Sequence, residues 1–304
     1  MNALATAADD YLAARRAVGY KLDETGRVLT GFVAYLDSIG AATVTVTAAV
    51  AWASNPPGRS NIAQRLSMIR GFARYLQALD TAHEIPPAGL IPNRTRRRVP
   101  HLYADTDITA LMDAARLLEP PIWAETCEAV IGLLAVTGCR IGELLRLNTI
   151  DIDWDSGVAT VWLTKFNKSR HVPLDPTTVV ALARYDEHRH QRLPSSTTPA
   201  LFVSLTGRRL RYTSFAATFA TLLDTARVTA VSGRPRIHDF RHSFATRTLL
   251  EWYRNGADVH AMLPRLSTYL GHVSPSTTYW YLSAAPELMA IAAEQLDQHR
   301  EDQQ

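Results

Sequence analysis

Cysteine is almost missing from this chain of 304 residues, and both cysteines, Cys127 and Cys139, fall in a helical-looking apolar segment. So few thiols exclude a small disulfide-bonded scaffold, and in such a segment each behaves as a small hydrophobic side chain. Long apolar runs are missing too, because the longest, Ala129–Thr137, is far too short to span a bilayer. The first residues also lack the apolar core and the cleavage site of a secretory signal. We therefore expect a protein of the reducing cytoplasm with no membrane role.

A large excess of one charge is absent as well, since the formal net charge is only +3. The distribution is uneven: residues 1–99 carry 12 Lys and Arg against 7 Asp and Glu, whereas residues 100–304 carry 20 against 22. Apolar residues make up 47% and charged residues 20%, which is typical of a globular protein, and the length suffices for two domains. The sequence thus indicates a basic module joined to a nearly neutral one.

The basic module, residues 1–85, has the pattern of a small helical bundle. We expect its helices at Tyr11–Val18, Leu29–Ser38, Val46–Ala53 and Ile62–Leu79. In the last of these, apolar residues recur at helical spacing, and three arginines point away from that stripe: Arg65, Arg70 and Arg74. They form either a surface for a polyanion or an ordinary solvated face.

Residues 86–100 form the predicted interdomain linker. Four prolines and a glycine between Ile85 and Pro100 oppose regular structure. Four arginines crowd into this segment: Arg94, Arg96, Arg97 and Arg98. Because closely packed like charges repel one another unless anions neutralise them, we expect the linker to follow a phosphate backbone.

The second domain, residues 101–304, is expected to be mainly α-helical with a small antiparallel β-sheet, an α+β class. Alternating apolar residues and β-forming side chains predict three strands, at Thr149–Trp154, Val158–Leu163 and Arg170–Leu174. Helices are expected at Asp105–Leu118, Pro121–Thr137 and Arg140–Leu147, and after the sheet everywhere except the loop Leu193–Pro199. Since proline cannot continue an α-helix, we expect a break at Pro264 with a second short helix starting there.

Two separate segments place an arginine where it could hold an anion. In Thr137–Leu147 (TGCRIGELLRL), Arg140 stands at a glycine-bounded helix start, and Glu143 lies on the same helical face. In HDFRH, His238 and Arg241 also share one face. An arginine held in this way can present its planar fork to a phosphate, although the Arg140–Glu143 pair alone also fits an ordinary surface ion pair.

A metal site is a competing interpretation of the second segment. His238 and His242 are four residues apart, the spacing of a helical zinc pair. However, Asp239 stands where a metalloprotease motif has glutamate, and no cysteine lies nearby. The chain also shows no carboxylate cluster suited to two-metal phosphoryl chemistry, so guanidinium and imidazolium groups would have to meet the charge of a phosphodiester transition state.

A lysine and a tyrosine complete the candidate groups. Lys165 lies in the predicted hairpin between the second and third strands, where a long amine can reach over a ligand. In STTYWYL, Tyr279 and Tyr281 flank a tryptophan, and they serve either as core packing or as a nucleophile. A phenol with a pKa of about 10 costs roughly 4 kcal/mol to ionise at neutral pH. A cationic pocket with a basic histidine can supply that energy.

These segments, in this order, resemble the motifs of the tyrosine recombinase (phage integrase) family. The family pattern is a T-G-x-R-x-x-E-L box, a hairpin lysine, an H-x-x-R box, an L-G-H box and, nine residues after that histidine, a tyrosine. Here the pattern is met by Thr137–Leu144, Lys165, His238–Arg241, Leu270–His272 and Tyr281. The resemblance is strong over about residues 100–290 and weaker over the N-terminal bundle. It implies a SAM-like core-binding domain, in which the arginines named above would contact DNA, followed by a recombinase catalytic domain.

The resemblance also implies a chemistry: DNA is cleaved and rejoined at specific sites with no metal and no cofactor. Tyr281 would attack the scissile phosphate to form a 3′-phosphotyrosyl link, and the freed 5′-hydroxyl would then attack the link on the partner strand. The other implied roles are phosphate binding by Arg140, Arg241 and His272, proton acceptance or phosphate binding by His238, protonation of the leaving 5′-oxygen by Lys165, and orientation of the arginine by Glu143.

The implied partners are double-stranded DNA recombination sites and further copies of the chain, as a tetramer on DNA, with sister recombinases or accessory factors as additional candidates. The amphipathic segment Pro286–Leu296 either docks on a neighbouring protomer, as the resemblance implies, or packs on its own domain. The residues before the L-G-H box and the Tyr-Trp-Tyr run favour a mobile-element integrase, acting in integration and excision.

Several alternatives remain open at this level. Phe166 follows Lys165 where the family often has glycine, so Lys168 competes for the role of general acid. Tyr279, seven residues after His272, competes for the nucleophile. For the whole chain, the competing interpretations are a Xer-type resolvase, a type IB topoisomerase, and a DNA-binding regulator on a decayed recombinase scaffold.

Overall fold

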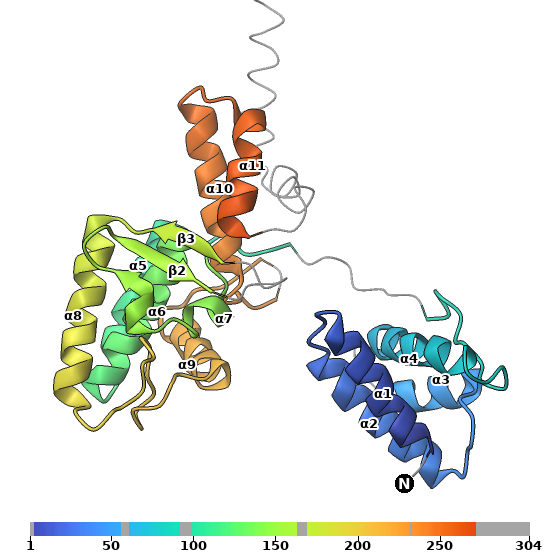
Figure 1. The fold of residues 1–304 in the computed structure, drawn as a ribbon. Coiled ribbons are helices and arrows are strands. Elements are labelled where there is room, and N and C mark those ends of the chain that lie inside the picture. Colours follow the sequence, from blue (N-terminus) through green and yellow to red (C-terminus); the bar gives the residue numbers. More distant parts are fainter. Residues whose placement is uncertain (1–2, 56–60, 92–98, 163–168, 232, 272–304) are drawn as a thin grey trace, which may run out of the picture. The chain divides into compact units, whose positions relative to one another are not determined.

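The computed structural model describes residues 3–55, 61–91, 99–162, 169–231 and 233–271 (Figure 1). The chain divides into two compact units, residues 1–97 and 98–304. This division falls inside residues 86–100, the segment that the sequence predicts as a linker. Within the described ranges, no helix combines the length and the apolar character needed to cross a membrane.

The first unit is a helical bundle. Its helices are α1 (Ala3–Ala17), α2 (Asp23–Ser38), α3 (Val46–Ser54) and α4 (Ile62–Gln77). The largest side chains of its core come from α2 and α4 and are fully buried, among them Phe32, Leu36, Ile69 and Phe72. α2 begins earlier than the apolar pattern alone predicts, because Asp23 and Glu24 place negative charge in its first turn, where the helix dipole favours it.

The second unit is built around a long buried helix, α6 (Pro121–Thr137). α6 contacts α5 (Asp105–Arg116), α8 (Pro176–Arg192), α10 (Asp239–Arg254) and the short α7 (Ile141–Leu144) (Figure 1). Ten of its residues are buried, so it carries no polar stripe and serves as the centre of the core. The mainly α architecture with a small sheet is confirmed.

The sheet has three antiparallel strands in the order β1 (Ile152–Asp153), β2 (Val158–Val161) and β3 (Arg170–Pro173). β1 is shorter than predicted because a 3₁₀ turn, η1 (Thr149–Asp151), replaces its first half. The Asp151 carboxylate stabilises that turn by accepting a hydrogen bond from the Asn148 backbone N–H at 2.7 Å. Val161, the last residue of β2, pairs with Arg170, the first residue of β3.

Two expectations about the chain after the sheet are wrong. Helix α11 (Val259–Leu270) runs through Pro264 without a break. Proline removes one backbone donor in the middle of this helix, and burial of Leu263, Leu266 and Leu270 outweighs that loss. The non-helical segment between α8 and α9 (Tyr212–Thr225) is also longer than the predicted loop. In it the chain turns back at Gly207, which has a positive φ, and Val203 forms an antiparallel β-bridge with Arg209.

Candidate active site

The first site element is the corner between α6 and α7. Arg140 is the N-cap residue of α7, and its backbone N–H donates to Oε2 of Glu143 at 3.0 Å. Its guanidinium Nη1 donates to the other carboxylate oxygen, Oε1, at 2.7 Å. Glu143 is only 3% exposed, so the pair is not an ordinary surface ion pair. The side chain of Arg140 remains about one third exposed, at 32%.

Gly138 makes this corner possible. It ends α6 in the left-handed conformation, with φ of 58°, which glycine adopts without strain. A Cβ atom here would lie 2.6 Å from a ring carbon of Phe244 on α10. A larger residue would therefore push α10 away from the corner.

Arg241, on α10, fixes the second site element. It is 1% exposed, and its Nη1 donates to the carbonyl oxygen of Gly138 at 3.0 Å. Its Nη2 donates to the carbonyl oxygen of Leu270, the last residue of α11. Arg140 donates from Nη2 to the next carbonyl, that of Gly271, at 3.2 Å. Two arginines from distant segments therefore meet at the stretch of chain that leads into His272.

Arg170 is a third arginine at the site, and it belongs to none of the motifs found in the sequence. It stands at the start of β3, and its Nη2 donates to Oε2 of Glu143 at 2.8 Å and contacts Sγ of Cys139 at 3.5 Å. Its sequence signal is its position at the start of the predicted strand that follows Lys165 and Lys168. Two guanidinium groups, those of Arg140 and Arg170, thus hold one buried carboxylate.

The pKa of Glu143 reflects this surrounding. Burial alone would raise it, but the hydrogen bond and charge of Arg170, together with the hydrogen bonds from Arg140, lower the pKa to about 2. Glu143 is therefore ionised throughout the physiological range and holds both arginines by charge-assisted hydrogen bonds.

Two histidines adjoin Arg241. The rings of His238 and His242 meet edge to face, with centroids 5.0 Å apart. Burial, and then the charges of Arg241 and Arg140, lower the pKa of His238. Burial, and then the charge of His238, lower the pKa of His242 to about 4. Both rings are consequently neutral near pH 7, and a neutral imidazole can accept a proton.

The structure brings together four of the residues selected from the sequence: Arg140, Glu143, His238 and Arg241. Nine further residues singled out above lie outside the described residues: Arg94, Arg96, Arg97, Arg98, Lys165, Lys168, His272, Tyr279 and Tyr281. No three His, Cys, Asp or Glu side chains in the described part of the chain are grouped so that they could hold a metal ion.

In the first unit, the three arginines of α4 do not share one face. Arg65 is 8% exposed, stacks 3.8 Å from the ring centroid of Trp52, and donates to the carbonyls of Ala53 and Asn55 at 3.0 and 2.7 Å. The expectation that it points away from the core is wrong, because Trp52 and the end of α3 cover it. Arg70 donates to the Pro86 carbonyl at 2.6 Å, and Arg74 is exposed.

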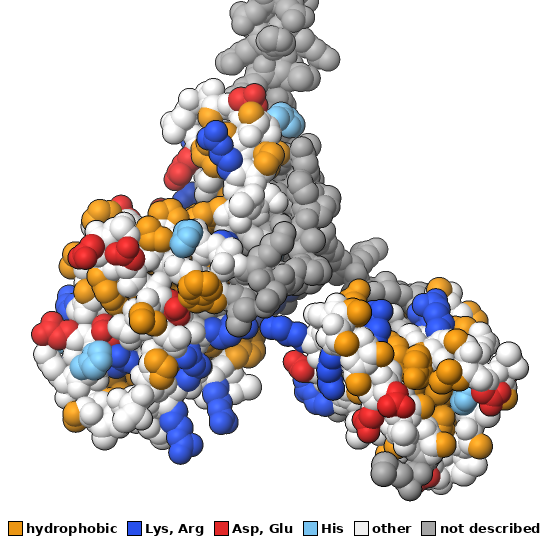
Figure 2. Space-filling model, in the orientation of Figure 1, with side chains coloured by type: hydrophobic (Ala, Val, Ile, Leu, Met, Phe, Trp, Pro, Cys, Tyr) orange, Lys and Arg blue, Asp and Glu red, His pale blue; other side chains and the backbone are white. Residues whose placement is uncertain are grey.

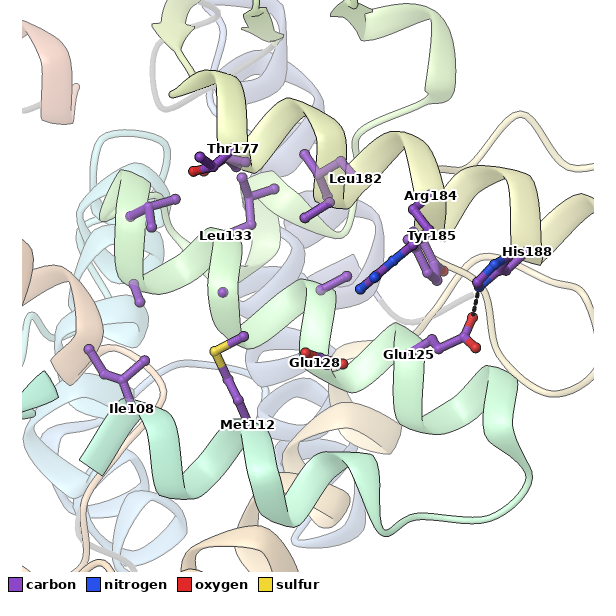
Figure 3. A pocket seen from close by; sticks show the side chains of 16 residues that line it. Ile108, Met112, Glu125, Glu128, Leu133, Thr177, Leu182, Arg184, Tyr185 and His188 are labelled. Atoms are coloured by element: carbon purple, nitrogen blue, oxygen red, sulfur yellow. Dashed lines mark hydrogen bonds and ion pairs between the residues drawn. The ribbon is translucent and has the colours of Figure 1, made fainter. Parts of the chain in front are cut away.

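An apolar groove of about 460 Å³ lies between α5, α6 and α8 (Figure 3). Met112, Leu133 and Leu182 line it, and His188 pairs with Glu125 at 3.1 Å at one end. None of its lining residues belongs to the arginine cluster, which comprises Arg140, Arg170 and Arg241 at the corner between α6 and α7. The visible surface of the second unit carries both signs of charge, with several Lys and Arg side chains towards its lower end (Figure 2).

Comparisons with known proteins agree with this architecture. Residues 103–287 match the family model of the phage integrase family. The chain is 40% identical over 314 aligned residues to a putative integrase/recombinase, y4rB, of Sinorhizobium fredii, with 99% of each chain covered. It is 30% identical to the tyrosine recombinase XerC of Alcanivorax borkumensis, over 72% of this chain and 67% of that protein.

Among solved structures, the integrase of the Tn1549 transposon in complex with transposon right end DNA has a TM-score of 0.66 at 16% identity and covers 96% of this chain and 98% of its own. A λ integrase dimer bound to a core site has a TM-score of 0.61 at 17% identity, with 91% and 76% covered. At sequence identities this low, the similarity to these structures shows a shared fold.

A mainly helical domain with a small sheet, in which an R-x-x-E corner and an H-x-x-R helix converge on Leu270 and Gly271 at the end of α11, defines the class of enzymes that cleave and rejoin DNA strands. The chain belongs to the phage integrase family and is a tyrosine recombinase.

Proposed function

We propose that this protein is a site-specific integrase of the mobile-element type, which integrates and excises DNA through a 3′-phosphotyrosyl intermediate at Tyr281. It acts in the cytoplasm on double-stranded recombination sites, as a tetramer. The observation that carries the proposal is the meeting of Arg140 and Arg241 at the consecutive carbonyls of Gly271 and Leu270. This arrangement supports a phosphate site directly beside the L-G-H box.

In the proposed mechanism, Arg140 and Arg241 bind the non-bridging oxygens of the scissile phosphate. An arginine has five N–H donors, so one guanidinium can hold a backbone carbonyl and a phosphate oxygen at the same time. Loss of either arginine should slow strand cleavage by about 10²-fold or more, because these cations meet charge that develops in the transition state.

His238 accepts the proton of Tyr281 in this mechanism, or bonds the phosphate. Its lowered pKa, caused by burial and then by Arg241 and Arg140, leaves the ring neutral and able to act as a base near pH 7. His272 supports the same phosphate, Lys165 protonates the leaving 5′-oxygen, and Glu143 orients Arg140. These assignments of Tyr281, His272 and Lys165 rest on motif spacing.

The mobile-element assignment is preferred to a Xer-type resolvase because of the extent of similarity. The relative named integrase/recombinase is 40% identical and covers 99% of the chain, whereas XerC is 30% identical and covers 72%. A type IB topoisomerase, in contrast, would relax any supercoiled plasmid without a defined site.

For assembly, we propose that the segment Pro286–Leu296 docks on a neighbouring protomer and so couples cleavage to formation of the tetramer. A chain truncated after Ala285 should then bind one half-site normally but lose cooperative binding to a full site. Normal cooperativity of the truncated chain in a gel-shift titration would contradict this part of the proposal.

The function is tested with nicked suicide duplexes taken from the ends of the protein's own element. Wild-type protein should become covalently joined to the 3′ end, as seen on denaturing gels. Tyr281→Phe should abolish the adduct, whereas Tyr279→Phe should retain it. Adducts that persist in Tyr281→Phe and vanish in Tyr279→Phe would reassign the nucleophile. A folded, DNA-bound wild type that forms no adduct would overturn the function.

A further inference from the structure

We propose that Arg170 is a positioning residue for strand cleavage, which holds Glu143 and, through it, keeps Arg140 available to the scissile phosphate. The inference rests on the proposed function, because it assigns Arg170 a part in the same phosphate site. Three observations carry it: the division of the Glu143 carboxylate, the burial of Arg170, and the position of Arg170 donors that have no partner in the described part of the chain.

The first observation is that two guanidinium groups share one carboxylate. Oε1 of Glu143 accepts from Nη1 of Arg140 at 2.7 Å, whereas Oε2 accepts from Nη2 of Arg170 at 2.8 Å. A carboxylate paired with one arginine alone would neutralise it. Shared between two, it leaves a net positive charge on the pair of arginines, and that charge is what stabilises a phosphodiester transition state.

The second observation is that Arg170 cannot turn away into solvent. Its side chain is 10% exposed, and its residue pairs with Val161 in the sheet. Removing it would leave the buried Glu143 with Arg140 as its single cationic partner among the described residues. Because an unpaired buried charge is costly, Arg140 would be drawn more tightly onto the carboxylate and away from an incoming phosphate.

The third observation is where the remaining donors of Arg170 lie. Its Nε and Nη1 atoms are buried and have no hydrogen-bond partner among the described residues. Nη1 lies 3.1 Å from the point that a Cβ atom of Gly271 would occupy, and Nη1 of Arg140 lies 3.7 Å from the same point. Both cations therefore face the chain that enters His272, where an anion would complete their hydrogen bonding.

The matched control is Arg189, another buried arginine of the same unit. It is 4% exposed, pairs with Asp186 at 2.9 Å and donates to the Ala200 carbonyl. It belongs to α8 and not to the arginine cluster. Arg189→Ala should reduce the stability of the protein, with the cleavage rate of the folded fraction unchanged.

The test compares variants in single-turnover cleavage of the suicide duplex at saturating protein, with DNA affinity measured separately. Arg170→Ala should cleave about 10- to 100-fold more slowly, while its Kd for DNA stays within about threefold of the wild type. Arg170→Lys should recover part of the rate, because it restores a cation without the planar fork. Arg170→Ala combined with Glu143→Gln should cleave no more slowly than the slower single variant, since both act through Arg140.

Wild-type cleavage by Arg170→Ala, a loss confined to DNA affinity, or multiplying effects in the double variant would each overturn the inference. If Arg170→Ala does not fold, the inference is tested with Arg170→Lys and with the uncharged double variant Glu143→Gln/Arg170→Gln. Reduced cleavage at unchanged DNA affinity supports the inference, and wild-type cleavage rates reject it. Failure of the wild type to form any adduct would instead count against the proposed function.

Discussion

Arg241 donates a hydrogen bond to the carbonyl oxygen of Gly138 at 3.0 Å, although the two residues are 103 positions apart in the chain. The direction of that carbonyl depends on the left-handed conformation of Gly138, with φ of 58°. Gly138, in the first motif, therefore orients the carbonyl oxygen that holds Arg241, in the second motif. This relationship makes the backbone at Gly138 as important to the site as the side chains around it.

Replacement of Gly138 by alanine should destabilise the protein by at least about 2 kcal/mol, because the residue would carry a strained φ and press its Cβ against Phe244. The same variant should cleave suicide DNA more slowly, since Arg241 loses its fixed acceptor. Urea unfolding and single-turnover cleavage measure the two effects.

Gly142 provides the control for this substitution. A Cβ atom there meets nothing within 4 Å, and the residue lies inside α7. Gly142→Ala should leave the unfolding free energy within about 1 kcal/mol of the wild type or raise it. Equal losses in the two variants would show that the conformation of Gly138 is not the cause.

Arg65 and Arg74 lie on the same helix and should respond differently to alanine substitution. Arg65→Ala removes two hydrogen bonds to carbonyls and the stacking on Trp52, which should destabilise the protein by about 2 kcal/mol. Arg74→Ala should leave stability unchanged and reduce the salt dependence of DNA binding by about one unit of slope. Thermal unfolding and fluorescence anisotropy at several salt concentrations distinguish them. An equally stable Arg65→Ala protein with a reduced salt slope would contradict the structural role of Arg65.

Stability should fall as the pH drops from 6.5 towards 4. The folded-state pKa of His242, about 4, lies below its ordinary value of 6.5 because of burial and the neighbouring His238. As the pH falls through this range, His242 is therefore protonated in the unfolded chain before it is protonated in the folded chain. The contribution of neutral His242 to the free energy of unfolding is complete above pH 6.5 and is lost as the pH falls towards 4. For His242 it amounts to about 3 kcal/mol.

His242→Asn should flatten the dependence of unfolding free energy on pH between 7.5 and 5, measured by urea titration. His238, whose pKa shifts in the same direction, leaves a remaining slope. A slope unchanged by the substitution would mean that His242 titrates normally in the folded protein.

The choice between Lys165 and Lys168 can be made by changing the leaving group. Lys165→Ala should slow cleavage of ordinary DNA by about 10²-fold, because the 5′-oxygen leaves without a proton. A substrate with sulfur at the bridging 5′ position should restore the rate, since a thiolate leaves readily unprotonated. Lys168→Ala should behave like the wild type on both substrates. The reverse pattern would identify Lys168 as the general acid.

Sequence periodicity predicted the fold class, the three strands and most helices, and motif spacing selected Arg140, Glu143, His238 and Arg241. Arg140 and Glu143, like His238 and Arg241, are three residues apart in the sequence, so helix geometry alone relates the members of each pair. The family pattern relates the two pairs to each other. Arg170 was not selected, because its contact with Glu143 depends on how β3 meets α7. Arg65 was misplaced for a similar reason: a helical projection of α4 does not contain Trp52, which covers it from another helix. Tertiary packing also allowed Pro264 within α11.

The chain's two cysteines, Cys127 and Cys139, are both buried. Burial raises the pKa of the Cys127 thiol to about 12 and also raises that of Cys139. Protonated, enclosed thiols react slowly with maleimides. Fluorescent dyes can therefore be attached to a cysteine introduced on the surface of each unit without first removing the native ones, and energy transfer between the dyes would measure the distance between the two units with and without DNA.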